Sequence, residues 1–156
     1  MRNLTRVLLA TLSLVGVSCG SSNSKSEFIG TWSPSGTYTL TCGGDAQTTQ
    51  LTDNITWATS STSDLIQTSA GSSCVIHANV SGNTATASAG QSCTTSGTDD
   101  TGAAYQMTIN LQNYTFVVAA DGHTAQESLS ANVSYISGGV TTPCTMVESA
   151  VSFTKQ

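Results

Sequence analysis

The stretch YQMTINLQ, residues 105–112, alternates apolar and polar side chains from one position to the next. Successive side chains of a β-strand point to opposite faces, so this pattern predicts a half-buried antiparallel strand. Its apolar face would hold Tyr105, Met107, Ile109 and Leu111. We expect QNY (112–114) to turn the chain into a second strand, TFVVAA, which Asp121-Gly122 ends with a tight hairpin turn.

The segment from His123 to Tyr135 alternates in the same way. Its apolar face carries Ala125, Leu129, Ala131, Val133 and Tyr135, and Glu127 falls on this face as well. Further strands are predicted at 36–42, 49–57, 64–69, 73–80, 84–93 and 144–153, with short turns such as Ser81-Gly82-Asn83 between them. No segment has the 3.6-residue apolar stripe of an amphipathic helix.

These patterns predict an all-β fold, an antiparallel meander of about eight or nine strands. Short hairpins between successive strands favour a lipocalin-like up-and-down β-barrel over a two-sheet sandwich. A membrane-spanning barrel is the rival architecture, and its outer face would be an apolar band with aromatic girdles. The polar faces of these strands consist instead of Thr, Ser, Gln and Asn.

Residues 1–18 have the pattern of an export signal peptide. Arg2 and Arg6 precede an apolar run from Val7 to Val17, which is shorter than the roughly 20 residues of a membrane-spanning helix. The run ends at Ser18-Cys19, and VGVSC (15–19) resembles the lipobox of bacterial lipoproteins. The alternative is an ordinary signal peptide in which Cys19 is incidental.

The lipobox resemblance implies lipidation of Cys19 by acyl chains such as palmitate, and a lasting anchor in the membrane. Residues 19–27 would then form the lipidated cysteine and a flexible Gly/Ser tether, and residues 28–156 a single barrel or sandwich domain. Gly20 follows the cysteine where Asp would direct retention at the inner membrane, so the resemblance implies the outer membrane of the cell envelope.

Four cysteines lie in the predicted domain: Cys42, Cys74, Cys93 and Cys144. An even number in an exported chain implies two disulfides, with three possible connectivities. A hairpin near Gly82 would bring Cys74 close to Cys93. Pairing of the first and last strands would make Cys42 and Cys144 neighbours, so we expect the disulfides Cys74–Cys93 and Cys42–Cys144.

The charge balance excludes several classes of partner. Once the signal is removed, two lysines, Lys25 and Lys155, stand against nine carboxylates, a net charge of −7. Nucleic acid is excluded as a partner because its binding needs cationic side chains for phosphate contacts. Phosphorylated substrates are disfavoured for the same reason, and the membrane, through the acyl anchor, is the predicted partner.

FIGTW (28–32) resembles the GxW start of lipocalin-type barrels, with Gly30 and Trp32 at the two signature positions. In that family the Trp packs across the barrel base, and a basic residue near the final strand stacks on it. The final strand here has no Arg, and Lys155 lies at its very end, so the second half of the signature is missing. The alternative is that Trp32 is an ordinary core aromatic.

The layout as a whole resembles uncharacterised lipoproteins of Gram-negative bacteria, notably the myxobacterial kind. The residues that carry this resemblance are the lipobox, GTW (30–32), TCGG (41–44) and VSGNTATASAGQSCT (80–94). The resemblance implies no activity.

Three carboxylates fall on apolar faces. Asp53 aligns with Ile55 and Trp57, and Glu127 with Ala125 and Leu129. Glu148 aligns with Cys144 and Met146, although Val147, Val151 and Phe153 form a competing apolar face on the same segment. A carboxylate on an inward face is costly unless it is paired or reached by water, and residues 27–154 contain no Lys or Arg.

We therefore consider a ligand cavity with a polar mouth, for which Trp32, Asp53, Trp57 and Glu127 are the candidate residues. The alternative is that the carboxylates lie at strand ends. No catalytic residue, metal site or cofactor is predicted: His77 and His123 are expected on the surface, and Asp99-Asp100 lacks the spacing of a calcium-binding EF-hand loop.

Two functions follow from these observations. The favoured one is a lipid-anchored structural or surface-interaction lipoprotein with a filled core, because the interiors of small barrels are usually filled. The alternative is a lipocalin-like barrel that binds a small, partly apolar ligand. An enzyme is not expected, since no nucleophile is placed beside a base.

Overall fold

The computed structural model describes residues 25–98 and 102–156. The signal peptide, Cys19, residues 19–24 of the tether and the Asp99-Asp100 pair lie outside the described residues. No helix of the described ranges is both long and apolar enough to cross a membrane.

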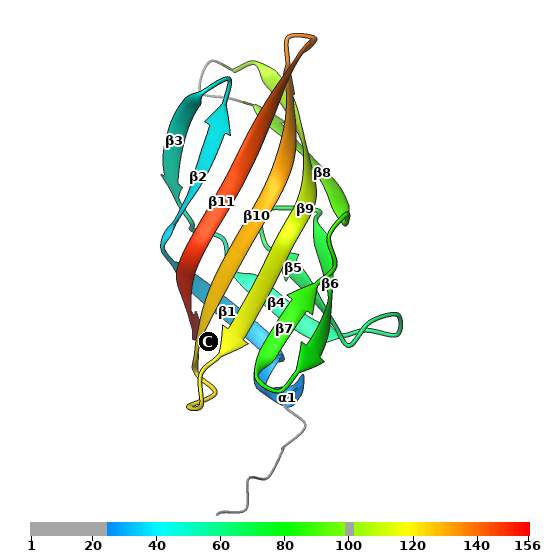
Figure 1. Cartoon of the computed structure of the whole chain (residues 1–156), viewed down its shortest axis with the longest axis vertical. Helices are drawn as coiled ribbons and strands as arrows, with labels where there is room; N and C mark the ends of the chain where they lie inside the picture. Colours follow the sequence, from blue (N-terminus) through cyan, green and yellow to red (C-terminus); the bar gives the residue numbers. More distant parts are fainter. Residues whose placement is uncertain (1–24, 99–101) are drawn as a thin grey trace, which may run out of the picture.

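A short helix, α1, precedes a continuous antiparallel sheet (Figure 1). The elements are α1 (Lys25–Phe28), β1 (Gly30–Ser35), β2 (Thr37–Cys42), β3 (Asp45–Gln50), β4 (Ile55–Thr59), β5 (Leu65–Ser69), β6 (Val75–Ser81), β7 (Thr84–Ala87), β8 (Ser92–Thr98), β9 (Ala104–Val118), β10 (Thr124–Ser137) and β11 (Val140–Lys155).

Eight of these strands close into a barrel, as the alternation predicted. The order is β1-β4-β5-β6-β7-β9-β10-β11, and β11 pairs back onto β1 with Trp32 opposite Lys155. Every pairing in this ring is antiparallel. The barrel is therefore confirmed over the sandwich.

Three further strands extend the sheet beyond the ring. β9, β10 and β11 are long strands that run the length of the molecule (Figure 1). Near the lower end they complete the barrel; near the upper end the hairpin β2–β3 pairs with β11, and β8 pairs with β9. The upper part is thus an open sheet in the order β3-β2-β11-β10-β9-β8.

Two predicted strands are each broken in the structure. The segment 49–57 is divided between β3 and β4, and residues 51–54 lie in the connection. The segment 84–93 is divided between β7 and β8, which pair with different halves of β9. Gly90, at φ +87°, lies in this second break and donates its N–H to the Leu111 carbonyl. Sequence alternation continued through both breaks and did not reveal them.

A bulge in β9 corrects the turn expected at QNY. Asn113 pairs with Ser130 and Leu111 with Ala131, so Gln112 is an extra residue on β9 and the strand continues through it. The insertion moves the inward face from odd to even positions, and Leu111 and Tyr114 are both buried. The predicted turn was wrong because a bulge and a turn look alike where alternation breaks.

A second bulge, in β11, explains the two competing faces of that segment. Glu127 pairs with Val151 while Leu129 pairs with Glu148, so β11 carries one extra residue between them. Ala150 has a positive φ of 54° there, and its N–H donates to Ser128 Oγ at 3.3 Å. Glu148 and Val151 are consequently both buried, on one face of one strand.

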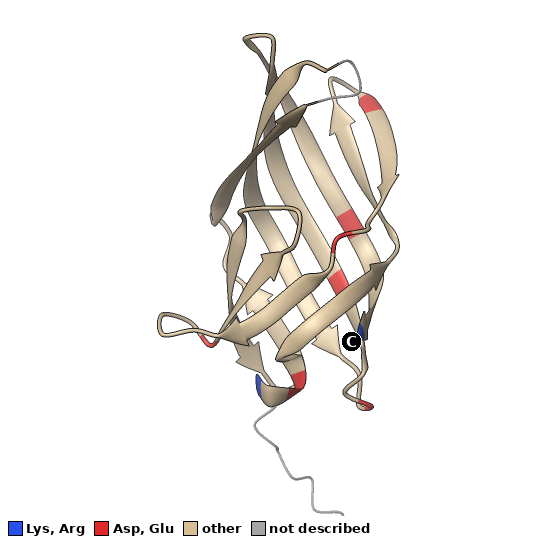
Figure 2. Cartoon of the chain, turned by 180° about the vertical axis from the view of Figure 1, so that it is seen from behind, with Lys and Arg blue, Asp and Glu red and all other residues tan. Residues whose placement is uncertain are grey.

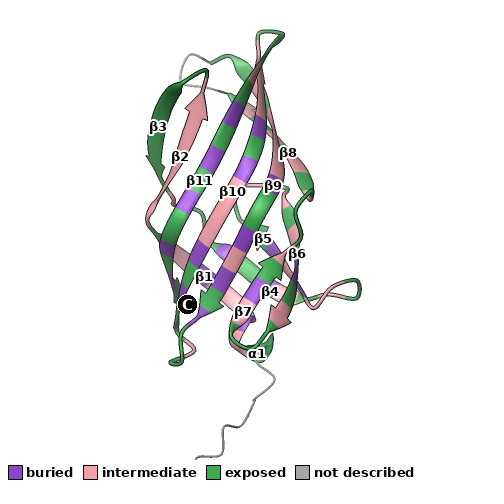
Figure 3. Ribbon diagram, in the orientation of Figure 1, coloured by how far each residue is buried: buried purple, intermediate pink, exposed green. Residues whose placement is uncertain are grey.

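The core is densest at the lower end of the barrel (Figure 3). Phe116 lies at its centre, with its ring 5.3 Å from Trp32, 5.5 Å from Trp57 and 5.4 Å from Phe153, centroid to centroid. A second, smaller cluster lies under the upper sheet and contains Ala131, Val133, Cys144 and Met146.

The first and last strands meet at the base of the barrel. Trp32 Nε1 donates to the Phe28 carbonyl at 2.8 Å, and Lys155 Nζ lies 5.3 Å from the centroid of the Trp32 ring. Gly30, at φ +126°, leaves room for this lysine, because a Cβ there would lie 3.2 Å from Lys155 Cε. The stacking lysine that the sequence seemed to lack is thus present.

Both predicted disulfides are confirmed, Cys42–Cys144 and Cys74–Cys93. The expected reason for the first was incomplete: Cys42 lies on β2, directly opposite Cys144 on β11, and outside the ring of eight strands. Cys93 likewise lies on β8, so its disulfide joins the upper sheet to the start of β6.

Candidate ligand-binding cavity

A cavity of about 370 Å³ lies where the two core clusters meet. Ile55 and Phe153 of the lower cluster line it, as do Met146 of the upper cluster and Leu129, which packs against both. Other apolar walls come from Leu51, Ile76, Ile109 and Leu111. The inside of the barrel is therefore packed at the base and hollow above it.

Polar residues of the connections and edge strands also line the cavity. They include Thr49 and Gln50 of β3, Asp53 of the β3–β4 connection, and Ser92 of β8. Gln50 and Asp53 are exposed to solvent, so this part of the lining is in contact with water. The site combines an apolar interior with a hydrated polar rim.

Glu127 projects into the barrel from β10 and is 4 % exposed. Tyr114 on β9 donates its hydroxyl to Glu127 Oε2 at 2.5 Å, and Gln67 Nε2 on β5 lies 3.4 Å from the same oxygen. Three strands thus converge on one carboxylate oxygen, which fixes the position of the side chain.

Glu148 lies beside Glu127 on the neighbouring strand, because the β11 bulge turns it inward. It is 7 % exposed, and both glutamates line the cavity. Glu148 Oε2 and Gln67 Oε1 are buried acceptors for which the described residues provide no hydrogen-bond donor. Buried polar atoms are usually paired, so these two acceptors are exceptions that need an explanation.

Burial raises the pKa of Glu127 well above its ordinary value, and the adjacent charge of Glu148 raises it further. The hydrogen bonds from Tyr114 and Gln67 oppose this shift. Burial also raises the pKa of Glu148, while a hydrogen bond with Glu127 lowers it. Two buried carboxyl groups side by side favour the state in which they share one proton.

Burial and the charge of Glu127 together raise the pKa of Tyr114 well above its ordinary value. Tyr114 therefore stays protonated and acts as a hydrogen-bond donor at every physiological pH. The polar groups at the cavity are therefore the uncharged phenol of Tyr114, the amide of Gln67 and the carboxyl pair of Glu127 and Glu148.

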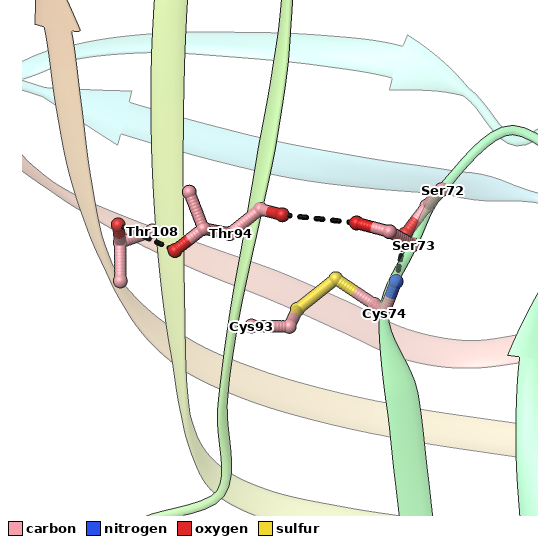
Figure 4. The surroundings of a disulfide bond; sticks show 6 residues. All are labelled: Ser72, Ser73, Cys74, Cys93, Thr94 and Thr108. Atoms are coloured by element: carbon pink, nitrogen blue, oxygen red, sulfur yellow. Dashed lines mark hydrogen bonds between the residues drawn. A yellow bond between two sulfur atoms is a disulfide. The ribbon is translucent and has the colours of Figure 1, made fainter.

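Cys74 and Cys93 line the cavity, and Figure 4 shows the disulfide between them. Ser73 Oγ donates to the Thr94 carbonyl at 3.1 Å, parallel to the disulfide, and Cys74 N–H donates to Ser72 Oγ at 2.8 Å. The disulfide and the Ser73–Thr94 hydrogen bond thus hold β8 against the connection between β5 and β6. The covalent bond holds the wall in place where no sheet pairing between β6 and β8 is present.

Neither lysine of the described residues faces the cavity. Lys25 pairs with Asp64 on the surface at 2.5 Å. Lys155 donates to the Glu27 carbonyl at 2.7 Å and lies over Trp32. Seen from behind, the basic positions lie near α1 and the carboxyl terminus, while acidic positions extend along the molecule (Figure 2).

The structure separates the four residues considered for a cavity. Asp53 and Glu127 line it, Asp53 at the exposed rim and Glu127 inside. Trp32 and Trp57 are fully buried in the aromatic base and are not part of the lining. His77 is exposed on the outer face of β6, and His123 follows the turn at Asp121-Gly122.

Sequence reasoning missed Gln67 and Tyr114, and left Glu148 between two faces. Gln67 shares the inward face of β5 with Leu65, a signal that was readable from their spacing. Tyr114 was assigned to a turn, and only the bulge reveals its orientation. Within the described ranges, no three His, Cys, Asp or Glu side chains gather as metal ligands.

The chain was compared with protein-family models, with curated proteins and with solved structures, and none of the three comparisons gives a match.

Proposed function

We propose that this chain is an exported β-barrel, tethered to a membrane through Cys19, that binds a small, partly apolar molecule in its cavity. The observation that carries the proposal is the hollow of about 370 Å³ above the packed aromatic base. We propose binding and assign the chain no catalytic role.

The size and chemistry of the cavity support binding. Small-molecule sites typically measure about 300–1,000 Å³ and combine apolar walls with a few convergent polar groups. Here the walls include Ile109, Leu129 and Phe153, and the polar groups are Glu127, Glu148 and Gln67. A barrel with a purely structural role has no need of such a hollow, and filled interiors are the default for small barrels.

The base of the barrel supports the lipocalin-like interpretation. Lys155 stacks on Trp32, so a basic residue of the final strand meets the Trp of the GxW start. The ring of eight antiparallel strands closes between these same two strands.

Two observations support export and the membrane tether. The leader ends in a lipobox-like sequence, and two disulfides are typical of an oxidising, extracytoplasmic compartment. The tether would join the domain at α1, at the lower end of the barrel and away from the open upper sheet (Figure 1).

A surface-interaction role is the second candidate, and the edges of the upper sheet favour it. Within the described residues β3 and β8 each pair with one strand only, and every β3 side chain is exposed. Such an edge can accept a strand from a partner, although the mostly polar side chains of β3 offer that partner little apolar surface.

A dye titration tests the binding proposal. The unacylated mature chain, secreted under an ordinary signal peptide with Cys19→Ser, would be titrated with acedan, a neutral polarity-sensitive naphthalene dye. We expect saturable, blue-shifted emission. Ile109→Trp fills the cavity and should abolish the signal, whereas Gln106→Trp on the outer face of the same strand should not. Equal signals from the two variants would exclude the cavity as the site.

A further inference from the structure

Two buried acceptors of the cavity lining lack a hydrogen-bond donor among the described residues, and the third unpaired buried atom, the donor Trp57 Nε1, belongs to the aromatic base. Tyr114 and Gln67 Nε2 both donate to one oxygen of Glu127. This leaves Glu148 Oε2 and Gln67 Oε1 buried without a donor, on residues that are 7 % and 5 % exposed and line the cavity. A ligand that satisfies both atoms must supply hydrogen-bond donors and needs no acceptor.

The same place holds negative charge without a counter-charge from the chain. The titratable groups around the pair are Tyr114 on β9, Tyr38 on β2 and Asp53 in the β3–β4 connection, and none of them is cationic. Lys25 and Lys155 are engaged elsewhere. Without a bound cation, the proton shared by Glu127 and Glu148 reduces the negative charge of the pair. A cationic ligand would replace that proton.

We propose that the ligand is a primary amine on a small apolar body, with its ammonium group between Glu148 and Glu127 and its apolar part against Leu129 and Ile109. This inference rests on the binding function proposed above and specifies the chemical class of its ligand. An ammonium group has three donors and no acceptor, which matches the unpaired oxygens of Glu148 and Gln67. A calcium ion fits less well, since it takes six to eight oxygens.

Matched ligands of one shape test the inference. Phenethylamine, phenethyl alcohol and phenylacetate carry the same aromatic body with a cationic, a neutral and an anionic end. Their dissociation constants for the unacylated mature chain would be measured by calorimetry. We expect the amine to bind at least about tenfold more tightly than the alcohol, as for a charge-assisted hydrogen bond, and phenylacetate to bind more weakly than either.

Isosteric variants assign the preference to the carboxyl pair. Glu148→Gln should bring the affinity for phenethylamine to that for phenethyl alcohol, both measured on this variant. Asp45→Asn removes one charge from the exposed strand β3 and should leave the amine preference intact. Circular dichroism verifies folding. If the variant does not fold, the wild-type chain still decides: the preference for the amine must decline as pH falls and both carboxyls become protonated.

The outcomes separate the two proposals. Acedan binding with equal affinities for amine and alcohol would overturn the amine inference and leave the binding function standing. An amine preference that survives Glu148→Gln would overturn it as well, as would saturable Ca²⁺ binding without any preference for the amine. Failure of acedan and of all three phenyl compounds to bind would remove both proposals.

Discussion

Lys155, the penultimate residue of the chain, lies over the ring of Trp32 and donates a hydrogen bond to the carbonyl of Glu27. It therefore joins the last strand of the barrel to the first strand and to α1. Because β1 and β11 close the ring, this contact stabilises the seam between two segments that are far apart in the sequence.

Replacing Lys155 tests the strength of this seam. We expect Lys155→Met to lower the free energy of unfolding by about 1–2 kcal/mol, since it removes a cation–π contact and a hydrogen bond but keeps much of the aliphatic stem. Lys25→Met is the matched control, because Lys25 makes an exposed ion pair with Asp64, and such pairs contribute about 0–1 kcal/mol. Urea unfolding measures both; equal losses would show that the seam lysine has no special role.

The β11 bulge contains a position at which a substitution should increase the stability of the protein. Ala150 has φ 54°, a conformation that costs an L-residue roughly 1–2 kcal/mol and a glycine almost nothing. Ala150→Gly should therefore stabilise the protein by up to about 1 kcal/mol, after the entropy cost of a glycine is subtracted. Ser149→Gly, one residue earlier and without a positive φ, should destabilise it. If both variants lose stability equally in thermal unfolding, the bulge geometry is wrong.

The two disulfides should differ in their contributions to stability. Cys42–Cys144 closes a loop with a sequence separation of 102, and Cys74–Cys93 one of 19. In the chain-entropy account a loop of about 100 residues contributes about 4.7 kcal/mol and one of about 15 residues about 3 kcal/mol. We expect the double replacement Cys42→Ala with Cys144→Ala to cost more than Cys74→Ala with Cys93→Ala. The reverse order in denaturant unfolding would contradict this account.

Loss of Cys74–Cys93 should nevertheless affect ligand binding more. This disulfide lines the cavity, whereas Cys42 and Cys144 do not. Acedan affinity should therefore fall in the Cys74→Ala, Cys93→Ala protein and remain near the wild-type value in the other variant. Affinities that change by the same factor in both would argue against a wall held by this disulfide.

The carboxyl pair predicts how stability depends on pH. The pKa values of Glu127 and Glu148 are raised by folding, so the protonated pair stabilises the native state below the ordinary glutamate pKa, and this contribution is lost as pH rises through the raised values. Asp64 and Asp121 have lowered pKa values through hydrogen bonds, to Lys25 and to the backbone at His123 respectively, and their contributions are lost only as pH falls below the ordinary aspartate pKa.

Unfolding measured across the range above about pH 4.5, the ordinary glutamate region, should show stability that declines toward alkaline pH. Glu148→Gln should reduce this slope and gain more stability near pH 8 than near pH 5. A slope that the variant leaves unchanged would show that the pair is not the group that titrates.

Much of the barrel was predictable because its signal is local. Alternation gives the inward faces of residues 105–111 and of β10 directly, and the inward row from Ala125 to Tyr135 is confirmed, with Glu127 inside it. The disulfide pairing was also predicted correctly, although the expected pairing of the first and last strands is not what brings Cys42 to Cys144, because Cys42 lies on β2.

The rest depends on relationships that alternation does not contain. A bulge adds one residue and reverses the face of everything after it, which is why Tyr114 was placed in a turn and Glu148 between two faces. The branching of β2, β3 and β8 away from the ring is likewise a tertiary feature. β2 pairs with part of β11 and β8 with part of β9, while the other parts of β9 and β11 belong to the barrel, and β3 pairs with β2. The polar cluster at the cavity requires both bulges, so it could not be assembled from the sequence.

The most direct test of the account is a methyl-detected NMR titration of the unacylated mature chain with phenethylamine. The account predicts saturable shifts at the cavity methyls of Ile109, Leu129 and Met146, with Leu65 in the packed base unchanged, and a weaker affinity for phenethylamine in Glu148→Gln. Saturable shifts at the base or on the outer surface, with the cavity methyls unmoved, would contradict it.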